Sequence, residues 1–211
     1  TECCGTQADT PAAWAAVRDR LGLPDTVCLD LLRQAFCHAS YSRERDLPPS
    51  ACNQRLEFLG DAVLDLVLVE HLYLSHEDVP EGQLTKMKAT AVRSQSLARL
   101  ARQLGLGDHL LLGRGEEETG GRQKSSLLAD CFEALIGAVY LSTGLQATAE
   151  FILRDFGQLL QEIEAKGAVF DYKTALQEFL QERVRRTPAY RTVDALGPPH
   201  DRTFVVEVIY N

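Results

Sequence analysis

The chain has 211 residues, of which 45% are hydrophobic and 25% are charged, and its formal net charge is −8. This composition is ordinary for a globular protein, and the length allows one full hydrophobic core plus a smaller module. The acidic balance argues against a protein that coats nucleic acid through a uniformly basic surface.

The six cysteines stand at positions 3, 4, 28, 37, 52 and 131 and form no C-x-x-C pair, which argues against a structural zinc site. Scattered cysteines are typical of a reducing compartment, so we expect a cytoplasmic protein. The N-terminal residues hold no apolar segment of the signal-peptide kind. The apolar runs are interrupted by acids and are too short to cross a bilayer, so we expect no membrane association.

The N-terminal part of the chain predicts two amphipathic helices. Thr10 is a suitable cap and Pro11 a suitable first-turn residue for a helix that ends at Gly22. Residues 29–36 predict the next helix. We interpret His38, which follows it, as a capping or packing residue rather than a metal ligand.

The long apolar segment 53–69 predicts a helix, because it contains no proline and is too long for one strand. Glu57, Asp61 and Asp65 recur in it at every fourth position and therefore share one face. Acids grouped on an otherwise apolar helix either take up protons or bind cations.

The stretch from Glu81 to Gly105 predicts one further helix. Lys86 and Arg93 face the same way on it, either as phosphate contacts or as a solvated basic face. The glycine-rich, charged segment 113–122 lacks the P-loop pattern and predicts a mobile surface loop. Lys124, just after this loop, is another candidate phosphate contact.

A second apolar helix is predicted for residues 127–140, and its Asp130 and Glu133 share a face. Two apolar helices that both present acids predict a hard-cation site of oxygen ligands. Such a site fits Mg²⁺ or Mn²⁺ better than zinc. For either helix alone, a solvated acidic face remains the alternative.

The C-terminal part of the chain predicts two further helices followed by two strands. Residues 147–164 predict an amphipathic helix, and residues 172–182 predict another. Residues 190–193 and 203–210 are rich in β-branched and aromatic residues, which predicts two strands joined by a turn.

The two acidic segments resemble a known family. Arg55-Leu56-Glu57-Phe58-Leu59-Gly60-Asp61 is similar to the signature of the ribonuclease III family of double-stranded RNA endonucleases. Residues 128–138 are similar to the second acidic motif of that family in residue types, spacing and order. The resemblance implies a mainly α protein, with an all-helical nuclease domain followed by a partial α+β (α-β-β) double-stranded RNA-binding module.

The resemblance also implies the chemistry. Mg²⁺, for which Mn²⁺ can substitute, would be held by Glu57, Asp61, Asp130 and Glu133, with Asp61 and Glu133 as the catalytic residues. Hydrolysis of double-stranded RNA would leave 5′-phosphate and 3′-hydroxyl ends, in the processing of ribosomal and other RNA. Phe58 would contact the second subunit of a homodimer, whereas its spacing alone equally predicts core packing.

Two acids and one amide lie outside this set of site residues. Gln54 stands where the family commonly has Glu, and an amide holds a cation less well than a carboxylate does. Glu81 is similar to another acidic position of the family and is a secondary candidate. Asp65 matches no catalytic position of the family, so it either supports the site or is structural.

The C-terminal helix and two strands resemble the opening of a double-stranded RNA-binding domain. The RNA contacts that this resemblance implies are Thr174, Gln177, Glu178 and His200. The third strand and the lysine-rich helix start of that domain do not follow, so we expect a truncated module with reduced RNA affinity. The predicted domains are 11–164 for catalysis, 165–170 as a linker and 171–211 for RNA binding.

Two other functions stay open. A double-stranded RNA-binding or scaffolding relative with weak catalysis is one, although the intact acids Glu57, Asp61, Asp130 and Glu133 argue against it. A di-metal carboxylate oxidoreductase on a helix bundle is the other, but the chain lacks the Glu-x-x-His pairs that this class requires.

Overall fold

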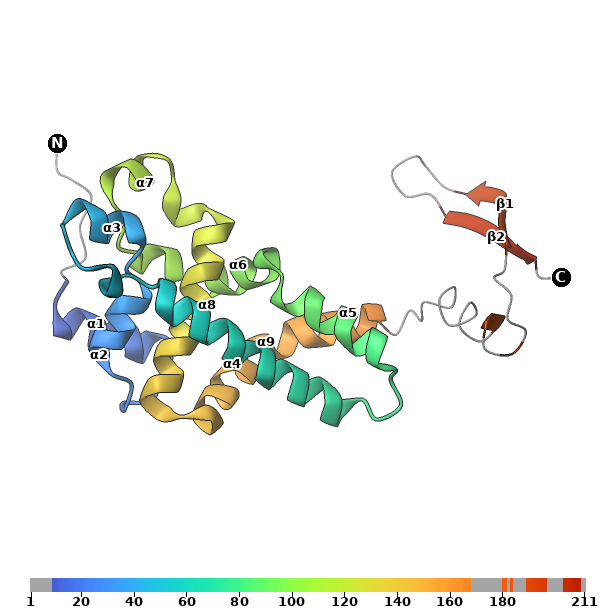
Figure 1. Ribbon diagram of the computed structural model, residues 1–211, viewed down its shortest axis with the longest axis horizontal. Helices are drawn as coiled ribbons and strands as arrows, with labels where there is room; N and C mark the ends of the chain where they lie inside the picture. The colour runs from blue at the N-terminus through green and yellow to red at the C-terminus, as the bar shows by residue number, and fades with distance from the viewer. Residues whose placement is uncertain (1–8, 168–179, 182, 184–188, 197–202, 210–211) are drawn as a thin grey trace. The chain divides into compact units, whose positions relative to one another are not determined.

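The computed structural model describes residues 9–167, 180–181, 183, 189–196 and 203–209. The chain divides into two compact units, residues 1–164 and residues 165–211, which are described separately. Figure 1 shows the first unit as a set of packed helices and the second with a pair of strands.

The described part of the first unit consists of helices joined by short turns. Its α-helices are α1 (Pro11–Arg20), α2 (Leu29–Ala35), α3 (Ala39–Glu44), α4 (Gln54–Ser75), α5 (Glu81–Val92), α6 (Ser94–Gln103), α7 (Arg114–Glu118), α8 (Ser125–Thr143) and α9 (Leu145–Gly167). The 3₁₀ turns are η1 (Pro49–Ala51), η2 (Leu106–His109) and η3 (Gly121–Gln123).

Helix α8 is the centre of the first unit, with α4, α6 and α2 packed around it (Figure 1). Its residues from Leu128 to Val139 are almost all buried, and Phe132 contacts the rings of Phe151 and Phe156 on α9. Because α8 is apolar all round except at Asp130 and Glu133, it is stable only inside a shell of other helices.

Helices α4 and α8 cross at a point where their backbones touch. A Cβ atom added at Gly60 would lie 1.7 Å from the carbonyl oxygen of Glu133, and one added at Gly137 would lie 2.3 Å from the carbonyl oxygen of Leu56. Only glycine allows so close an approach. The two glycines therefore set the crossing of α4 and α8.

The N-terminal prediction is confirmed. Thr10 caps α1, its hydroxyl accepting a hydrogen bond from the Ala13 N–H, and Pro11 is the first helical residue. Trp14 and Val17 are buried, and Gly22 follows with a φ of +61°.

The prediction of one helix from Glu81 to Gly105 is wrong, because Arg93 is extended and separates α5 from α6. Ser96 secures this break: its hydroxyl donates to the Thr90 carbonyl and accepts from the Arg93 guanidinium. Lys86 and Arg93 therefore do not lie on one helix face.

Most of residues 113–122 are exposed, as predicted for a surface segment, but the prediction of a loop is wrong, since the segment contains α7 and the start of η3. Side chains of α3 cap the first N–H groups of this region. Ser40 Oγ accepts from the Gly113 N–H at 2.9 Å, and Glu44 Oε2 accepts from the Arg114 N–H at 2.6 Å. These contacts satisfy donors that a short helix leaves free.

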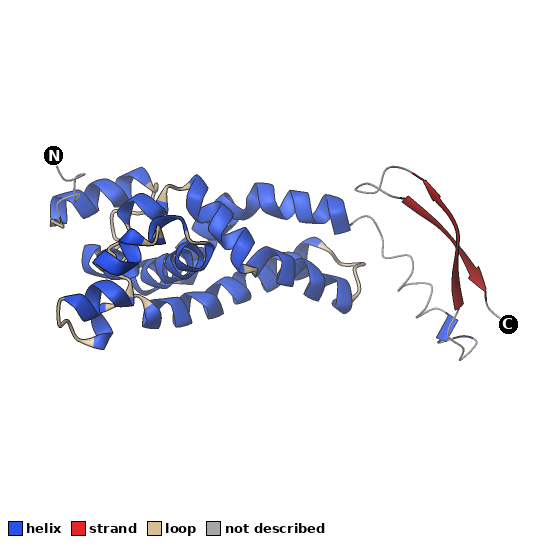
Figure 2. Ribbon diagram, turned by 90° about the horizontal axis from the view of Figure 1, so that it is seen from above, coloured by secondary structure: helices blue, strands red, loops and turns tan. Residues whose placement is uncertain are grey.

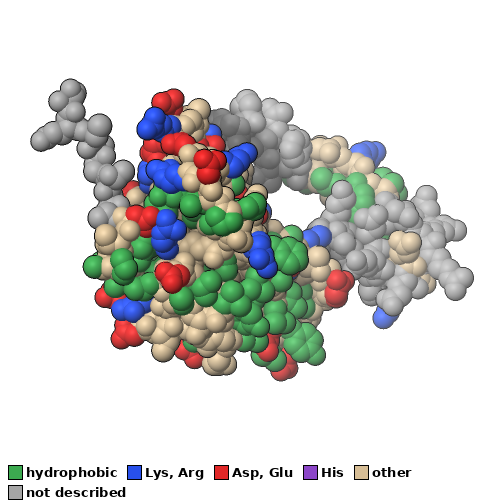
Figure 3. Space-filling model, turned by 60° about the vertical axis from the view of Figure 1, so that its left-hand side comes forward, with side chains coloured by type: hydrophobic (Ala, Val, Ile, Leu, Met, Phe, Trp, Pro, Cys, Tyr) green, Lys and Arg blue, Asp and Glu red, His purple; other side chains and the backbone are tan. Residues whose placement is uncertain are grey.

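The apolar residues of α4 are not all buried. Phe58, Leu66, Val69 and Tyr73 are each at least half exposed and recur at helical spacing, so they form one apolar stripe. Figure 3 shows one face of the protein on which hydrophobic side chains gather over a broad area. An exposed stripe of this kind is typical of an interaction surface.

Among the described residues, α8 has the length and apolar composition that could span a membrane. More than half of its most apolar stretch is buried inside the first unit. A central core helix has the same properties, so they are weak evidence for a membrane span.

The described part of the second unit contains β1 (Ala189–Leu196) and β2 (Thr203–Ile209), which pair antiparallel (Figure 2). Tyr190 lies opposite Val208, and the register shifts between Thr192 and Asp194 at a bulge. Across the pair, Arg191 forms an ion pair with Glu207. The predicted fold class, mainly helical with a small sheet near the C-terminus, is confirmed.

Two C-terminal predictions fall wholly or partly on residues that the structure does not describe. Of the helix predicted for residues 172–182, Leu180 and Gln181 are described and are helical. The turn at 197–201 lies outside the described residues. Helix α9 continues through Gly167, three residues into the predicted linker, and the domain boundaries stay a prediction.

We predict that Gly60→Ala destabilises the protein by about 1–3 kcal/mol, because the added methyl would overlap the Glu133 carbonyl and push α4 away from α8. Urea unfolding followed by circular dichroism measures the change.

The matched control is Gly157→Ala, also in a helix, where an added Cβ meets nothing within 4 Å. It should stabilise the protein by about 0.5–1 kcal/mol, the usual gain of alanine over glycine in a helix. If both variants lost equal stability, the backbone contact of α4 and α8 would not be tight.

Candidate metal centre

Three carboxylates from the two acidic helices converge at the α4–α8 crossing. Glu57 of α4 and Asp130 and Glu133 of α8 each offer an oxygen, and these three atoms lie within 4.8 Å of one another. All three side chains are half-buried. The described residues thus contain a group of oxygen ligands that could hold one cation.

The glycine contact explains why these acids meet. Glu57 follows Leu56, whose carbonyl touches Gly137, and Glu133 supplies the carbonyl that touches Gly60. Each acid is therefore carried by the part of its helix closest to the other helix. A larger interaxial distance, 8–10 Å being usual, would separate the carboxylates.

Asp61, predicted to act with them, is exposed and is not one of the three converging ligands. It lies near enough for its charge to raise the pKa values of Glu133 and Glu57. Its predicted role as a catalytic acid close to the metal stays a prediction.

The cluster holds its acids in an unfavourable environment. Burial, followed by the charges of Asp61, Glu57 and Asp130, raises the pKa of Glu133 to about 8. Burial is also the main cause that raises the pKa values of Glu57 and Asp130. Without a cation, Glu133 therefore holds a proton at neutral pH.

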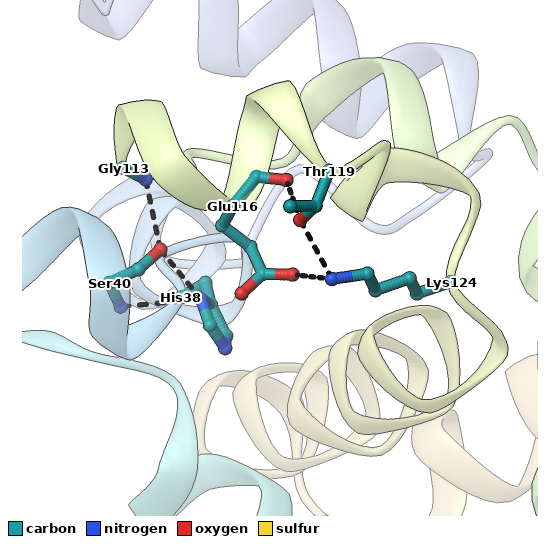
Figure 4. Close-up of polar contacts among 6 residues, drawn as sticks. All are labelled: His38, Ser40, Gly113, Glu116, Thr119 and Lys124. Atoms are coloured by element: carbon teal, nitrogen blue, oxygen red, sulfur yellow. Dashed lines mark hydrogen bonds and ion pairs between the residues drawn. The ribbon is translucent and has the colours of Figure 1, made fainter.

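His38 lies beside this cluster, and its ring is fixed by α3. Its Nδ1 accepts from the Ser40 N–H at 3.2 Å and lies 2.8 Å from the Ser40 hydroxyl, as the capping interpretation predicts (Figure 4). Burial lowers the pKa of His38, while the charges of Glu116 and Asp130 act against that shift. The neutral ring thus carries its proton on Nε2.

Lys124, predicted to contact phosphate, is engaged within the protein. Its Nζ forms an ion pair with Glu116 and lies 2.9 Å from the Thr119 hydroxyl (Figure 4). The Lys124 ammonium lowers the pKa of Glu116. Lys124 would have to exchange this pairing to reach a phosphate.

Other predicted residues lie outside the three-ligand cluster. Lys86 is exposed, and the guanidinium of Arg93 donates to Ser96 at 3.1 Å. Gln54 is exposed at the start of α4. Glu81 begins α5 and accepts from the Thr85 hydroxyl at 2.9 Å.

Asp65 has a partner on α5. Its Oδ2 accepts from the Lys88 ammonium at 2.8 Å, while its Oδ1 is buried without a hydrogen-bond partner. The charge of Asp65 also raises the pKa of Glu133. Asp65 thus joins α5 to α4 and adds to the acidic field without being one of the converging ligands.

Two further predictions concern partners. Phe58 is 81% exposed, so core packing within one chain is wrong, and its contact with a second subunit stays a prediction. The predicted RNA contacts Thr174, Gln177, Glu178 and His200 lie outside the described residues.

Sequence reasoning missed the glycines that bring the helices together and the acid that holds Lys124. Gly60 and Gly137 each lie inside an apolar helix, which is the signal for a close backbone approach. Glu116 lies in the segment predicted as a loop, so no pattern distinguished it from its neighbours.

The donor set fits a hard divalent cation. All three converging ligands are carboxylates, and such oxygen ligands favour Mg²⁺ or Mn²⁺ over softer metals. A dication would offset the loss of hydration that raises the pKa values of all three acids, and the repulsion from neighbouring acids that adds to it at Glu57 and Glu133.

Both parts of the chain match known protein families. The family model described as Ribonuclease-III-like matches residues 29–159, and the Double-stranded RNA binding motif matches residues 172–211. Ribonuclease 3 of Mycolicibacterium paratuberculosis is 48% identical over 196 residues, covering 90% of this chain and 80% of that protein. Ribonuclease 3 of Borreliella burgdorferi is 43% identical over 179 residues, covering 85% of this chain and 73% of that protein.

Among solved structures, the nuclease domain of ribonuclease III from Campylobacter jejuni is similar, with a TM-score of 0.60 and 38% identity. The match covers 67% of this chain and 94% of that chain. That structure is described as having structural flexibility in a region involved in dimer formation.

The raised pKa of Glu133 predicts a stability change with pH in the metal-free protein. The folded state binds this proton up to about pH 8, whereas the unfolded chain releases it near 4.5, the ordinary pKa of a glutamate. Stability therefore falls as pH rises from about 4.5 to about 8, by roughly 1–2 kcal/mol after allowance for solvent screening. Urea unfolding in excess chelator, at intervals across this range, measures the slope.

Glu133→Gln removes the titrating group and keeps the shape, so its slope over the same range should be smaller. Glu150→Gln, an exposed residue of α9, is the matched control and should keep the parent slope. Equal slopes in the parent and in Glu133→Gln would show that Glu133 does not titrate in this window.

Proposed function

Since this chain belongs to the ribonuclease III family, we propose that it is an endoribonuclease that hydrolyses double-stranded RNA with Mg²⁺. We further propose that it leaves 5′-phosphate and 3′-hydroxyl ends and acts in ribosomal and other RNA processing in the cytoplasm. The observation that carries this proposal is the convergence of Glu57, Asp130 and Glu133 within the region that the Ribonuclease-III-like model matches.

Glu57, Asp130 and Glu133 would hold the cation, and Mn²⁺ would substitute for Mg²⁺. Such an ion supplies an activated water and neutralises charge on the phosphate and the leaving oxygen. Glu133 must release its proton before it can act as a ligand, because its pKa is about 8 in the free site. The affinity for the cation should therefore rise with pH up to that value.

We assign proton transfer to Asp61. Its carboxylate is exposed, so it can exchange protons with solvent, and it lies one helical turn from Glu57. Removing it should leave the three converging ligands in place. Its loss should therefore slow the reaction more than it weakens cation binding.

RNA binding is proposed for both units. In the first unit we assign phosphate contacts to Lys124, Lys86 and Arg93. Lys124 lies one residue before α8, whose first turns carry Asp130. In the second unit the assignment rests on the match of residues 172–211 to the Double-stranded RNA binding motif. The domain boundaries 11–164, 165–170 and 171–211 are part of the same proposal.

We also propose a homodimer. The α4 apolar stripe of Phe58, Leu66, Val69 and Tyr73 leaves large hydrophobic side chains in water unless it is covered. The related Campylobacter jejuni domain has a region involved in dimer formation. In a twofold dimer each subunit would offer one acidic site, one for each strand of a duplex.

A catalytically weak RNA-binding relative is the second candidate. The observation that favours it is Gln54 at the start of α4, an amide at a position where the family commonly has Glu, whose carboxylate holds a cation better. The two candidates differ in whether a bound duplex is cut.

Cleavage of a long RNA duplex tests the function directly. With Mg²⁺ at low salt, which strengthens phosphate contacts, we expect cutting of the duplex, no cutting of the matching single strand, and no cutting of either in excess chelator. Gel analysis of the products measures cleavage and the chemistry of the ends. Binding of the duplex without cutting would favour the weak relative instead.

The variant Glu133→Gln should lower the cleavage rate by a factor on the order of 100 or more, because it removes a ligand charge. The control variant Glu150→Gln should cut at the parent rate. Near-parent turnover by Glu133→Gln, with circular dichroism unchanged, would contradict the assignment of the metal ligands.

We predict that Phe58→Ala weakens self-association, because this side chain is 81% exposed on the α4 apolar stripe. Burying an aromatic side chain contributes about 1.5–3 kcal/mol, so its loss should raise the dimer dissociation constant by about tenfold or more. Sedimentation equilibrium measures this constant.

Val193→Ala removes an exposed apolar side chain from β1 and serves as the control. It should leave the dissociation constant unchanged. An equal constant for Phe58→Ala and the parent chain would refute the contact.

A further inference from the structure

A second group of metal-binding side chains lies near the C-terminal end of α4. A pocket of about 340 Å³ separates this end of α4 from the C-terminal half of α9. His71, His76 and Glu164 line it, together with the polar side chains of Ser75 and Gln161. His71 is fourteen residues beyond Glu57, or about 20 Å along the helix, so the pocket is separate from the acidic cluster.

The tautomer of a neutral His76 ring follows from its contact with the backbone. Its Nδ1 lies 3.2 Å from the Leu72 carbonyl oxygen, which can only accept a hydrogen bond. Nδ1 therefore carries the proton, and the neutral ring has its lone pair on Nε2. Metal-binding histidines commonly have this arrangement, in which one ring N–H donates to a carbonyl and the other nitrogen binds the ion.

Nε2 of His76 faces a carboxylate across a short gap. Its distance to Glu164 Oε1 is 3.7 Å, which is too long for a hydrogen bond. Two ligand atoms of one tetrahedral zinc ion, each about 2.1 Å from the metal, lie about 3.4 Å apart. The gap thus suits a shared ion better than a direct contact.

The surrounding backbone favours a positive charge. His76 is the C-terminal cap residue of α4, and Glu164 lies in the last turn of α9, which ends at Gly167. The carbonyl ends of two helices thus flank the pocket, and each carries partial negative charge.

We propose that this pocket is a binding site for a transition-metal dication of the zinc type, held by His76, Glu164 and His71. Imidazole nitrogen and carboxylate oxygen are the ligands that zinc takes, whereas the acidic cluster, made only of oxygens, suits Mg²⁺. A cation there would join the end of α4 to the end of α9. The lack of a C-x-x-C pair does not bear on a site made of histidines.

One side chain has to move for the site to form. Among the described residues, three ligand atoms lie within 4.8 Å only in the acidic cluster, so the His71 ring must turn toward the pair. His71 is half-buried and lines the pocket, so rotation about its side-chain bonds brings the ring into an open space.

Calorimetric titration with ZnCl₂ tests the site. The titration uses the full chain carrying Cys3→Ser, Cys4→Ser, Cys28→Ser and Glu133→Gln, which is called the titration parent. The three serines remove thiols that would bind Zn²⁺. Glu133→Gln and excess Mg²⁺ keep Zn²⁺ from the acidic cluster. We expect one equivalent of Zn²⁺, and His76→Gln, Glu164→Gln and His71→Gln should each weaken binding at least about tenfold. With Co²⁺ in place of Zn²⁺, a visible absorption band should appear in the parent and be lost in His76→Gln.

Glu150→Gln, on α9 but outside the pocket, is the matched control for Glu164→Gln and should bind Zn²⁺ as the parent does. Circular dichroism checks that each variant is folded. An unchanged isotherm in His76→Gln and Glu164→Gln, or binding by the parent only at millimolar Zn²⁺, would overturn the proposal. In that case the pair is an ordinary His–Glu contact.

Discussion

The nuclease unit depends on the backbone contact between α4 and α8. Gly60 and Gly137 let the two helices approach until carbonyl oxygens occupy the space where side chains would otherwise lie. This closeness positions Glu57 against Asp130 and Glu133, and it buries the apolar surface of α8. Stability and the acidic site therefore depend on the same contact, because a change that separates the helices weakens the core and disperses the carboxylates.

The same contact holds carboxylates in a partly buried place, where their charged forms are unfavourable. The burial that makes α8 a core helix also raises the pKa values of its two acids, and the charge of Asp61 adds to that of Glu57 in raising the pKa of Glu133. A protein selected only for stability would have apolar or paired side chains here. The acids are instead held together by a rigid backbone, which keeps the ligands near one another without a cation. Such preorganisation is typical of a functional site.

The helices α4 and α8 and their acidic faces could be predicted from the sequence, because both follow from the spacing of residues close together in the chain. Glu57, Asp61 and Asp65 recur at intervals of four residues, which predicts a helix with one acidic face. The apolar character of residues 127–140 predicts the second helix, on which Asp130 and Glu133 share a face. The break at Arg93 could not be predicted, since no Gly or Pro marks it. The chain turns there between α5, which packs on α4, and α6, which packs on α8 and buries Leu97 and Leu100. The α7 region was misjudged for a related reason: its N–H groups are capped by Ser40 and Glu44, about 70 positions away in the chain.

Helix α4 connects these features through its different faces and ends. Near its first turns it presents acids to α8, and along its exposed side it carries an apolar stripe that begins at Phe58. At its last residues, histidines face α9 across a pocket. The acids, the apolar stripe and the histidines are all carried by this one helix of 22 residues. A partner covering the stripe, or a cation joining α4 to α9, would therefore act on the same element that holds Glu57 in the acidic cluster.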